Sequence, residues 1–309
     1  MIGIAAIAYE IPALRLDNAP RAAALHVLPE TLERRIGVRQ IARMEPGQDT
    51  SDLCVRAANK LFASGAVQPD EIDCVIVVTQ NPDAAGLPHT SAIVHGKLRL
   101  PEACAAFDVG LGCSGYVYGL SVARSFMEAN GLRRGLLVTA DPYSKVINEE
   151  DKRTALLFGD AAAVTLLSDQ PRWRIGAFDF GTVGNRGDAL EVRVSGDGKL
   201  HMNGRAVLAF SVGKVPESIR RALQRNGIGI EQIDRVVLHQ GSRVVVEDIA
   251  KALRLEDRTE FYAQDYGNVV SSSIPIVLAD QLQPSDRHVA ISGFGVGLSW
   301  ASTVLTRVD

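Results

Sequence analysis

Continuous apolar runs alternate along this chain with stretches in which apolar residues recur at helical spacing. Residues 74–79, 103–109 and 135–140 are apolar runs, which are typical of strands buried on both faces. Residues 116–129 have helical spacing, as do residues 53–63, which follow a good helix start at 49–52. Strands that alternate with helices in this way predict an α/β layered protein.

The second half of the chain repeats the plan of the first half. With a constant offset of 161 residues, residues 57–80 align without a gap on residues 218–241. Both segments read as a helix, an acidic turn and an apolar strand. Chance similarity between two amphipathic segments is the alternative explanation. A duplicated unit predicts two similar halves, residues 1–170 and 171–309.

Composition and charge indicate an ordinary globular protein. The 309 residues are 46% hydrophobic and 22% charged, with a net charge of -3, which argues against a polyanion-binding surface and a nucleic-acid partner. No apolar run approaches the roughly 20 residues of a membrane span, so we expect no membrane association. The N-terminus lacks the basic region of a secretion signal. The four cysteines form no CxxC pair and no cluster with histidine, so we expect no metal site, no disulfides and a cytoplasmic location.

One cysteine stands apart from the other three. Cys113 lies in Asp108-Val-Gly-Leu-Gly-Cys-Ser-Gly115, between an apolar run and a helical stretch. At a helix N-terminus, free backbone N–H groups and the helix dipole favour a thiolate. The alternative is a small buried residue that simply packs at the junction. We therefore treat Cys113 as a candidate nucleophile.

Two further stretches add polar groups suited to acyl chemistry. His239 ends the apolar strand of residues 236–241, at the strand end where α/β sheets bind ligands. Asn268 follows a glycine and precedes a serine-rich helix start, and its amide is a suitable neutral donor to an enolate oxygen. A hydrogen-bonded core histidine and an ordinary turn asparagine are the alternatives. Residues 292–300 form a glycine-rich turn that can present a backbone N–H to an oxyanion.

Five segments, in order over nearly the whole chain, resemble the ketoacyl synthase III family within the thiolase superfamily. They are Asp108-Val-Gly-Leu-Gly-Cys-Ser-Gly-Tyr-Val-Tyr-Gly-Leu120, Leu157-Phe-Gly-Asp-Ala-Ala-Ala163, Val237-Leu-His-Gln240, Tyr266-Gly-Asn-Val-Val-Ser-Ser-Ser-Ile-Pro275 and Gly293-Phe-Gly-Val-Gly-Leu-Ser-Trp300. The resemblance implies a five-layered αβαβα thiolase-like fold of two similar halves, and a homodimer. It also implies that Cys113, His239 and Asn268 are the catalytic residues.

The reaction implied by the resemblance has two steps. An acyl group moves from acyl-CoA, or from an acyl carrier thioester, onto Cys113. Decarboxylative condensation with malonyl-acyl carrier protein then gives a 3-oxoacyl thioester, in fatty acid or specialised metabolite synthesis. The backbone N–H groups of Cys113 and Val296 would form the oxyanion hole. Coenzyme A is then a substrate, and neither a metal nor a nicotinamide cofactor is required.

The resemblance also implies finer contacts. The loop of residues 81–89 would reach the partner subunit, where Leu87 helps to set acyl chain length. The expected acyl-pocket residues are Leu87 and Phe210; the expected contacts to coenzyme A or to the phosphopantetheine arm are Arg35, Lys152 and Arg153; and the expected carrier-docking cations are Lys214, Arg221, Arg243 and Lys251. An ordinary solvated charged face is the alternative for the docking cations.

Departures from the family pattern leave other readings open. The position of the tryptophan that stacks on adenine falls near Thr31, Gly241-Ser-Arg-Val replaces Ala-Asn-Leu-Arg, and Val296 replaces a glycine. These changes favour a specialised branch, including acyl transfer to an oxygen or nitrogen acceptor. A non-catalytic subunit of a heterodimer is a second alternative. A degradative thiolase is disfavoured because no cysteine follows Cys113, and a hydroxymethylglutaryl synthase because no matching glutamate motif is present.

Overall fold

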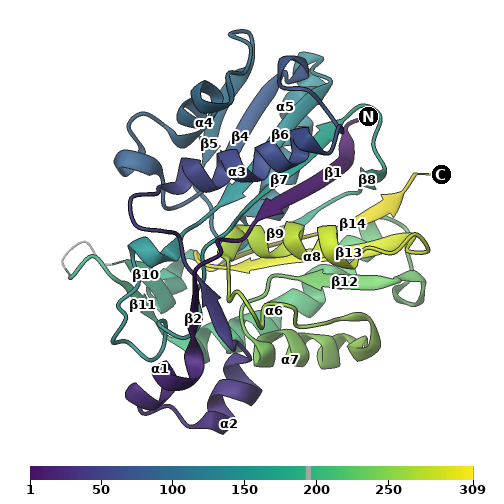
Figure 1. The fold of residues 1–309 in the computed structure, drawn as a ribbon. Helices are drawn as coiled ribbons and strands as arrows, with labels where there is room; N and C mark the ends of the chain where they lie inside the picture. The colour runs from purple at the N-terminus through teal and green to yellow at the C-terminus, as the bar shows by residue number, and fades with distance from the viewer. Residues whose placement is uncertain (193–195, 309) are drawn as a thin grey trace.

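Ten of the described strands form one long mixed sheet in which the two halves of the chain occupy opposite ends (Figure 1). The computed structural model describes residues 1–192 and 196–308. The strand order is β12-β13-β14-β8-β1-β7-β6-β4-β5, and β9 also pairs with β14. The first-half strands are β1 (Gly3–Glu10), β4 (Cys74–Val78), β5 (Ala105–Val109), β6 (Arg134–Ala140) and β7 (Ala162–Ser168). The second-half strands are β8 (Trp173–Ile175), β9 (Asp179–Thr182), β12 (Arg235–Leu238), β13 (His288–Gly295) and β14 (Ser299–Arg307).

Helices cover the outer faces of the two halves of this sheet and also lie between them, so the fold has five layers. The outer helices α3 (Thr50–Ala63) and α4 (Thr90–Leu98) pack on the first-half strands, and α6 (Gly204–Arg225) and α7 (Arg243–Leu253) pack on the second-half strands. The central helices α5 (Gly115–Asn130) and α8 (Ser273–Gln281) share one apolar cluster with strands of both halves. The expected αβαβα arrangement is confirmed.

The repeated segments occupy equivalent places in the two halves. In the first half β4 pairs in parallel with β6, which pairs antiparallel with β7. In the second half β12 pairs in parallel with β13, which pairs antiparallel with β14. Residue 170 lies between β7 and β8, but β1 hydrogen-bonds with β8 across that point. The division of the chain at residue 170 therefore stays a prediction.

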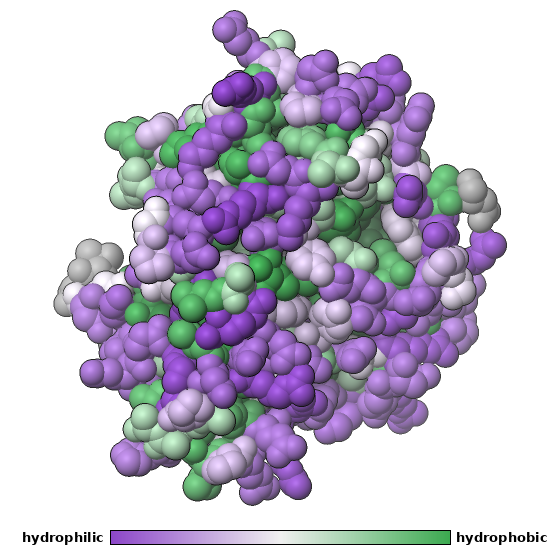
Figure 2. Space-filling view, in the orientation of Figure 1, coloured by the Kyte–Doolittle hydropathy of each residue, from purple (hydrophilic) through white to green (hydrophobic). Residues whose placement is uncertain are grey.

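Smaller elements lie beside the layers. They are β2 (Arg15–Asp17), β3 (Gln40–Ala42), α1 (Asn18–Ala24), α2 (Pro29–Thr31), and the hairpin of β10 (Leu190–Val192) and β11 (Leu200–Met202). The expected start of α3 is confirmed, since Asp49 and Asp52 form a capping box. Figure 2 shows that the face viewed in Figure 1 is largely hydrophilic, with smaller hydrophobic areas in its middle and along its outline. No helix among residues 1–192 and 196–308 is long and apolar enough to cross a membrane.

Candidate active site

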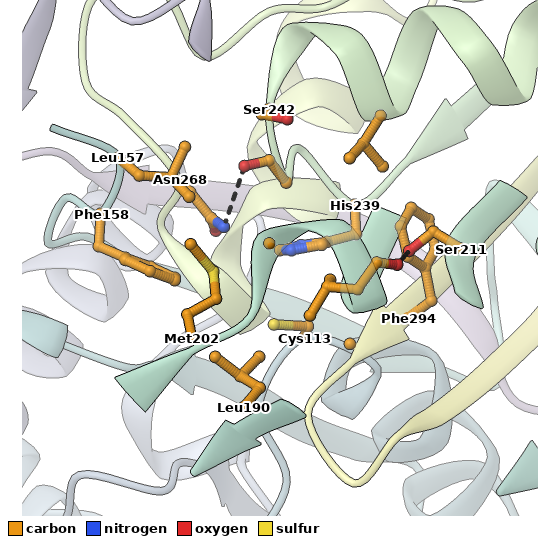
Figure 3. A pocket seen from close by; sticks show the side chains of 15 residues that line it. Cys113, Leu157, Phe158, Leu190, Met202, Ser211, His239, Ser242, Asn268 and Phe294 are labelled. Carbon is orange, nitrogen blue, oxygen red and sulfur yellow. Dashed lines mark hydrogen bonds between the residues drawn. The ribbon is translucent and has the colours of Figure 1, made fainter. Parts of the chain in front are cut away.

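Cys113 lies where the chain leaves β5 and enters α5. The strand ends at Val109 and the helix begins at Gly115, so the thiol stands just before the first turn of the helix. Only 3% of Cys113 is exposed, and its side chain lines a cavity of about 80 Å³ (Figure 3). His239 and Asn268, from the other half of the chain, line the same cavity. The structure thus brings the three predicted catalytic side chains together.

A glycine turn after β13 passes very close to the thiol. A Cβ atom on Gly295 would lie 2.6 Å from Cβ and 2.8 Å from Sγ of Cys113, and Gly295 has a φ of +155°. Only glycine tolerates this approach without displacing the cysteine. The next residue, Val296, directs its backbone N–H at the thiol, as Cys113 does with its own N–H. These two donors are the pair expected to form an oxyanion hole.

The protonation state of Cys113 corrects the expectation of a thiolate. Burial raises the pKa of Cys113 to about 12, and the charge of Asp141 acts in the same direction. The N–H groups of Val296 and Cys113 lower the pKa, but by less than burial raises it. Before substrate binds, Cys113 is therefore a neutral thiol, and the helix N-terminus alone does not ionise it.

His239 is also neutral. It follows β12, is 3% exposed, and burial lowers its pKa to about 4. Its Nδ1 atom lies 2.9 Å from Oγ of Ser273. The ring of Phe294 packs against the imidazole in a T-shaped contact, with 5.6 Å between ring centroids. At neutral pH the imidazole therefore has one N–H group and one lone pair.

The amide of Asn268 is held in a fixed orientation. Its Oδ1 accepts a hydrogen bond of 2.9 Å from the N–H of Val270, and its Nδ2 donates to the carbonyl of Gly241 at 3.4 Å. Its backbone N–H donates to Leu157 and its carbonyl accepts from Gly159, as in a β-bridge. Because Oδ1 is occupied, the amide presents its NH₂ group to the cavity.

The cavity has an apolar wall that suits an acyl chain. Leu157, Leu190, Met202 and Val207 contribute to this wall, and the β10–β11 hairpin supplies two of them (Figure 3). Phe210 does not line this cavity in the described part of the chain. It is buried and packs on Trp300, with 5.8 Å between ring centroids. The helix turns about 100° per residue, so Val207 and Ser211 face the cavity, and the place of Phe210 in the acyl pocket stays a prediction.

The cations expected at the entrance lie in different surroundings. A groove of about 720 Å³ contains Arg39 and Arg243 but is not lined by Arg35, Lys152 or Arg153, which are exposed. Asp17, Glu33 and Asp265 line the groove as well, and Asp265 pairs with Arg39. The groove is therefore mixed in charge, and the predicted contacts to coenzyme A stay predictions.

The cations expected to dock a carrier protein differ in their ion pairs and in their exposure. Arg221 forms a two-bond ion pair with Asp179 and a further ion pair with Glu217. This pairing weakens the prediction for Arg221, because a docking cation must be free to meet a partner's acids. Lys251 lies 3.6 Å from Asp248 on the surface of α7. Lys214 is exposed. Leu87, which was expected in the acyl pocket and not at the docking surface, is 87% exposed on its loop.

Sequence reasoning missed several groups that support the site. Asp141, at the end of β6, is fully buried and accepts hydrogen bonds from the N–H of Gln80 and the hydroxyl of Ser271. Burial raises the pKa of Asp141 to about 7. Ser272 donates to the carbonyl of Thr139. The serine-rich run after Asn268 was the available signal in the sequence. The hydrogen-bond partner of each serine can be identified only in the folded chain.

This arrangement suits acyl transfer. A thiol faces two backbone N–H donors, and a neutral imidazole and an oriented amide lie at the same cavity. Among the residues that the structure describes, no cluster of three or more His, Cys, Asp or Glu side chains could hold a metal ion. Fold and site together define a thiolase-type α/β acyltransferase.

Comparison with known proteins gives the family. Residues 107–184 match the family model of 3-oxoacyl-[acyl-carrier-protein] synthase III, and residues 223–307 match that of its C-terminal part. The chain is 32% identical to the β-ketoacyl-[acyl-carrier-protein] synthase III of Lactococcus lactis subsp. cremoris MG1363, over 96% of this chain and 97% of that one. The chain belongs to the 3-oxoacyl-[acyl-carrier-protein] synthase III family.

Solved structures agree with this assignment. A crystal structure of a 3-oxoacyl-(acyl-carrier-protein) synthase III superposes with a TM-score of 0.91, at 36% identity and 99% coverage of both chains. The 3-oxoacyl-(acyl carrier protein) synthase III of Pseudomonas aeruginosa PAO1 gives a TM-score of 0.90 at 30% identity, covering 99% of this chain and 98% of that one.

Proposed function

We propose that the protein is a ketosynthase that loads an acyl group from acyl-CoA, or from an acyl carrier thioester, onto Cys113. It then condenses that group with malonyl-acyl carrier protein, with loss of carbon dioxide, to give a 3-oxoacyl thioester. The main observation behind this proposal is that Cys113, neutral His239 and Asn268 line one apolar cavity. Coenzyme A enters as a thioester substrate, and the proposed chemistry requires no metal or other cofactor.

In the first step the Cys113 sulfur attacks the thioester carbonyl carbon. The carbonyl oxygen gains negative charge and is held by the N–H groups of Cys113 and Val296. The carbon–sulfur bond to coenzyme A then breaks, and the thiol proton ends on the departing sulfur. Because Cys113 starts as a neutral thiol, the lone pair of His239 is the nearby base for that proton.

In the second step the bond between malonyl carbon and carboxylate breaks, and its electron pair forms an enolate. An N–H of His239 and the NH₂ of Asn268 hold the enolate oxygen. The enolate carbon attacks the acyl carbonyl on Cys113, the carbon–sulfur bond to Cys113 breaks, and the resulting thiolate takes a proton from solvent. Phe294 is an apolar neighbour of the imidazole, and it therefore favours the neutral ring that donates in this step.

The two steps can be tested separately. Cys113→Ala should abolish both the acyl-enzyme, seen by intact-protein mass spectrometry, and condensation. Asn268→Ala should still be acylated but should fail to release carbon dioxide from malonyl-acyl carrier protein, by about 10²-fold or more. Loss of acylation with retained decarboxylation in Asn268→Ala would show that the roles are misassigned.

Two other functions stay open under the same assay. If malonyl thioesters are never consumed while Cys113 is acylated, the protein transfers acyl groups to an oxygen or nitrogen acceptor instead. If no donor acylates Cys113, a non-catalytic partner subunit is favoured. The sequence near Thr31, which lacks the adenine-stacking tryptophan, makes the choice of donor the first quantity to screen.

We further propose a homodimer built on the edge strand β5. Its pairing side has no neighbour in the described chain, and every residue of β5 is half-buried. Half-buried or exposed apolar side chains surround it, namely Phe107, Tyr118, Val122, Phe126 and Phe180. Sedimentation should give a dimer, and Leu87→Phe should shorten the preferred acyl donor if Leu87 enters the partner's pocket. A monomer, or an unchanged donor profile, would count against this assembly.

The location and the carrier contact are part of the same proposal. The four cysteines are all free and buried, which supports a reducing cytoplasm. An acidic carrier protein is expected to contact Lys214 and Arg243; Arg243 lies 3.7 Å from Glu247 and would exchange this partner for an acid of the carrier. Charge reversal at Arg243 should raise KM for a carrier-bound substrate more than for a small thioester.

A further inference from the structure

Ser273 makes a contact that the two-step mechanism has not yet used. Its hydroxyl oxygen lies 2.9 Å from Nδ1 of His239 and 2.9 Å from the carbonyl oxygen of Val270. The backbone N–H of Gln240 points at the same oxygen from 3.4 Å. Ser273 is fully buried, and His239 is 3% exposed, so protein groups alone surround this contact in the described chain.

The turn that carries Ser273 also fixes Asn268. Val270, at 0% exposure, has a φ of +52°, which is unusual for a β-branched residue. In this conformation its N–H donates to Oδ1 of Asn268 and its carbonyl faces both Ser273 and His239. One strained residue thus orients the surroundings of two catalytic side chains.

A single hydroxyl at this place is compatible with either neutral form of the imidazole. When Ser273 donates to the carbonyl of Val270, its oxygen accepts a proton-bearing Nδ1, and Nε2 has a lone pair. When the hydroxyl turns to donate to Nδ1, its oxygen accepts the N–H of Gln240, and Nε2 bears the proton. In the second arrangement the carbonyl of Val270 still accepts the backbone N–H of Ser273.

The proposed function requires both forms. Acylation uses Nε2 as the acceptor of the Cys113 proton, whereas decarboxylation uses Nε2–H as a donor to the enolate oxygen. Burial lowers the pKa of His239 to about 4, so between the two steps the ring bears only one proton at neutral pH. Asn268 is fixed as a donor and cannot replace the changing role of His239.

We propose that Ser273 is a positioning residue that lets His239 bear its proton on Nδ1 during acylation and on Nε2 during decarboxylation. In the exchange Nε2 takes a proton from water that enters the cavity with the substrate, and the buried Nδ1 releases its proton to water through a transient local opening of the turn. The net charge and the bonds to carbon are unchanged. This inference rests on the proposed function and names a residue outside its catalytic set.

The decisive variant is Ser273→Ala. Without the hydroxyl, Nδ1 faces only the carbonyl of Val270, which accepts but cannot donate. The ring is then fixed with its proton on Nδ1. We expect acylation of Cys113 within about threefold of wild type and a loss of malonyl decarboxylation of about 10²-fold. Ser273→Thr retains a hydroxyl and should recover most of the decarboxylation.

Ser272→Ala is the matched control. Ser272 is an equally buried serine on the same turn, but it donates to the carbonyl of Thr139 and not to His239. A merely structural role of the serines would lower both steps in both variants. Equal loss of acylation and decarboxylation in Ser273→Ala, without recovery in Ser273→Thr, would overturn the proposal.

Nitrogen-15 NMR of the histidine ring tests the same idea without turnover. In acyl-enzyme bound to a malonyl amide, wild type should show a protonated Nε2, and Ser273→Ala a protonated Nδ1. A protonated Nε2 in Ser273→Ala would refute the proposal. If wild type is acylated but never decarboxylates malonyl thioesters, the proposed function fails, and the NMR comparison alone still decides the role of Ser273.

Discussion

Gly295→Ala should disable acylation without unfolding the protein. The new Cβ would lie 2.6 Å from Cβ and 2.8 Å from Sγ of Cys113. Carbon atoms in ordinary contact stand about 3.5–4.0 Å apart, so the thiol or the glycine turn must move by about 1 Å. A shift of that size at reacting atoms costs about 10²-fold in rate, which is close to 3 kcal/mol of transition-state stabilisation.

The measurement is a time course of acyl-Cys113 formation by intact-protein mass spectrometry. Gly47→Ala is the matched control, since Gly47 has a φ of +84° but a Cβ atom added there would meet no other atom within 4 Å. Gly47→Ala therefore has the backbone strain without the collision, and it should acylate at the wild-type rate. A folded Gly295→Ala protein that acylates as fast as wild type would refute the reasoning.

Three further outcomes follow from the charges described above. Because burial holds the pKa of Cys113 near 12, its alkylation by iodoacetamide should rise about tenfold per pH unit from pH 7 to 10, and a plateau below pH 9 would reveal a thiolate. Arg221→Ala should cost about 1–2 kcal/mol by leaving Asp179 unpaired, whereas exposed Lys214→Ala should leave the melting temperature unchanged. Burial raises the pKa of Asp141 from 3.8 to about 7, so its protonated form stabilises the fold at low pH and this contribution is lost as pH rises through 7. The melting temperature of Asp141→Asn should therefore rise relative to that of wild type between pH 4 and 7. A difference in melting temperature that stays constant over this range would contradict this sign.

The fold was accessible from the sequence because its largest elements follow simple periodicities. The buried runs became β4 and β6, and the helical spacing from residue 116 became α5. The repeat placed equivalent strands in both halves. The joining of the halves through β1 and β8 was not accessible, because only Gly3 and Ile4 of β1 pair with β8.

The site was accessible only in part. Cys113, His239 and Asn268 stand at turns after strands or before helices, where the local sequence marks them. Their protonation states depend on burial, which the sequence near Cys113 does not report. The packing of Phe210 on Trp300 and the pairing of Arg221 with Asp179, which is 42 residues away, depend on contacts between distant segments.

The position of β1 has a consequence for how the chain folds during synthesis. β1 is made well before its partners, which are β7 (Ala162–Ser168) and β8 (Trp173–Ile175). It must wait, unpaired, until more than half of the chain has left the ribosome, because no earlier strand pairs with it in the described sheet. Such long-range pairing slows folding and exposes a strand edge in the meantime. During synthesis β1 therefore lacks its sheet partners until residues 162–175 have emerged.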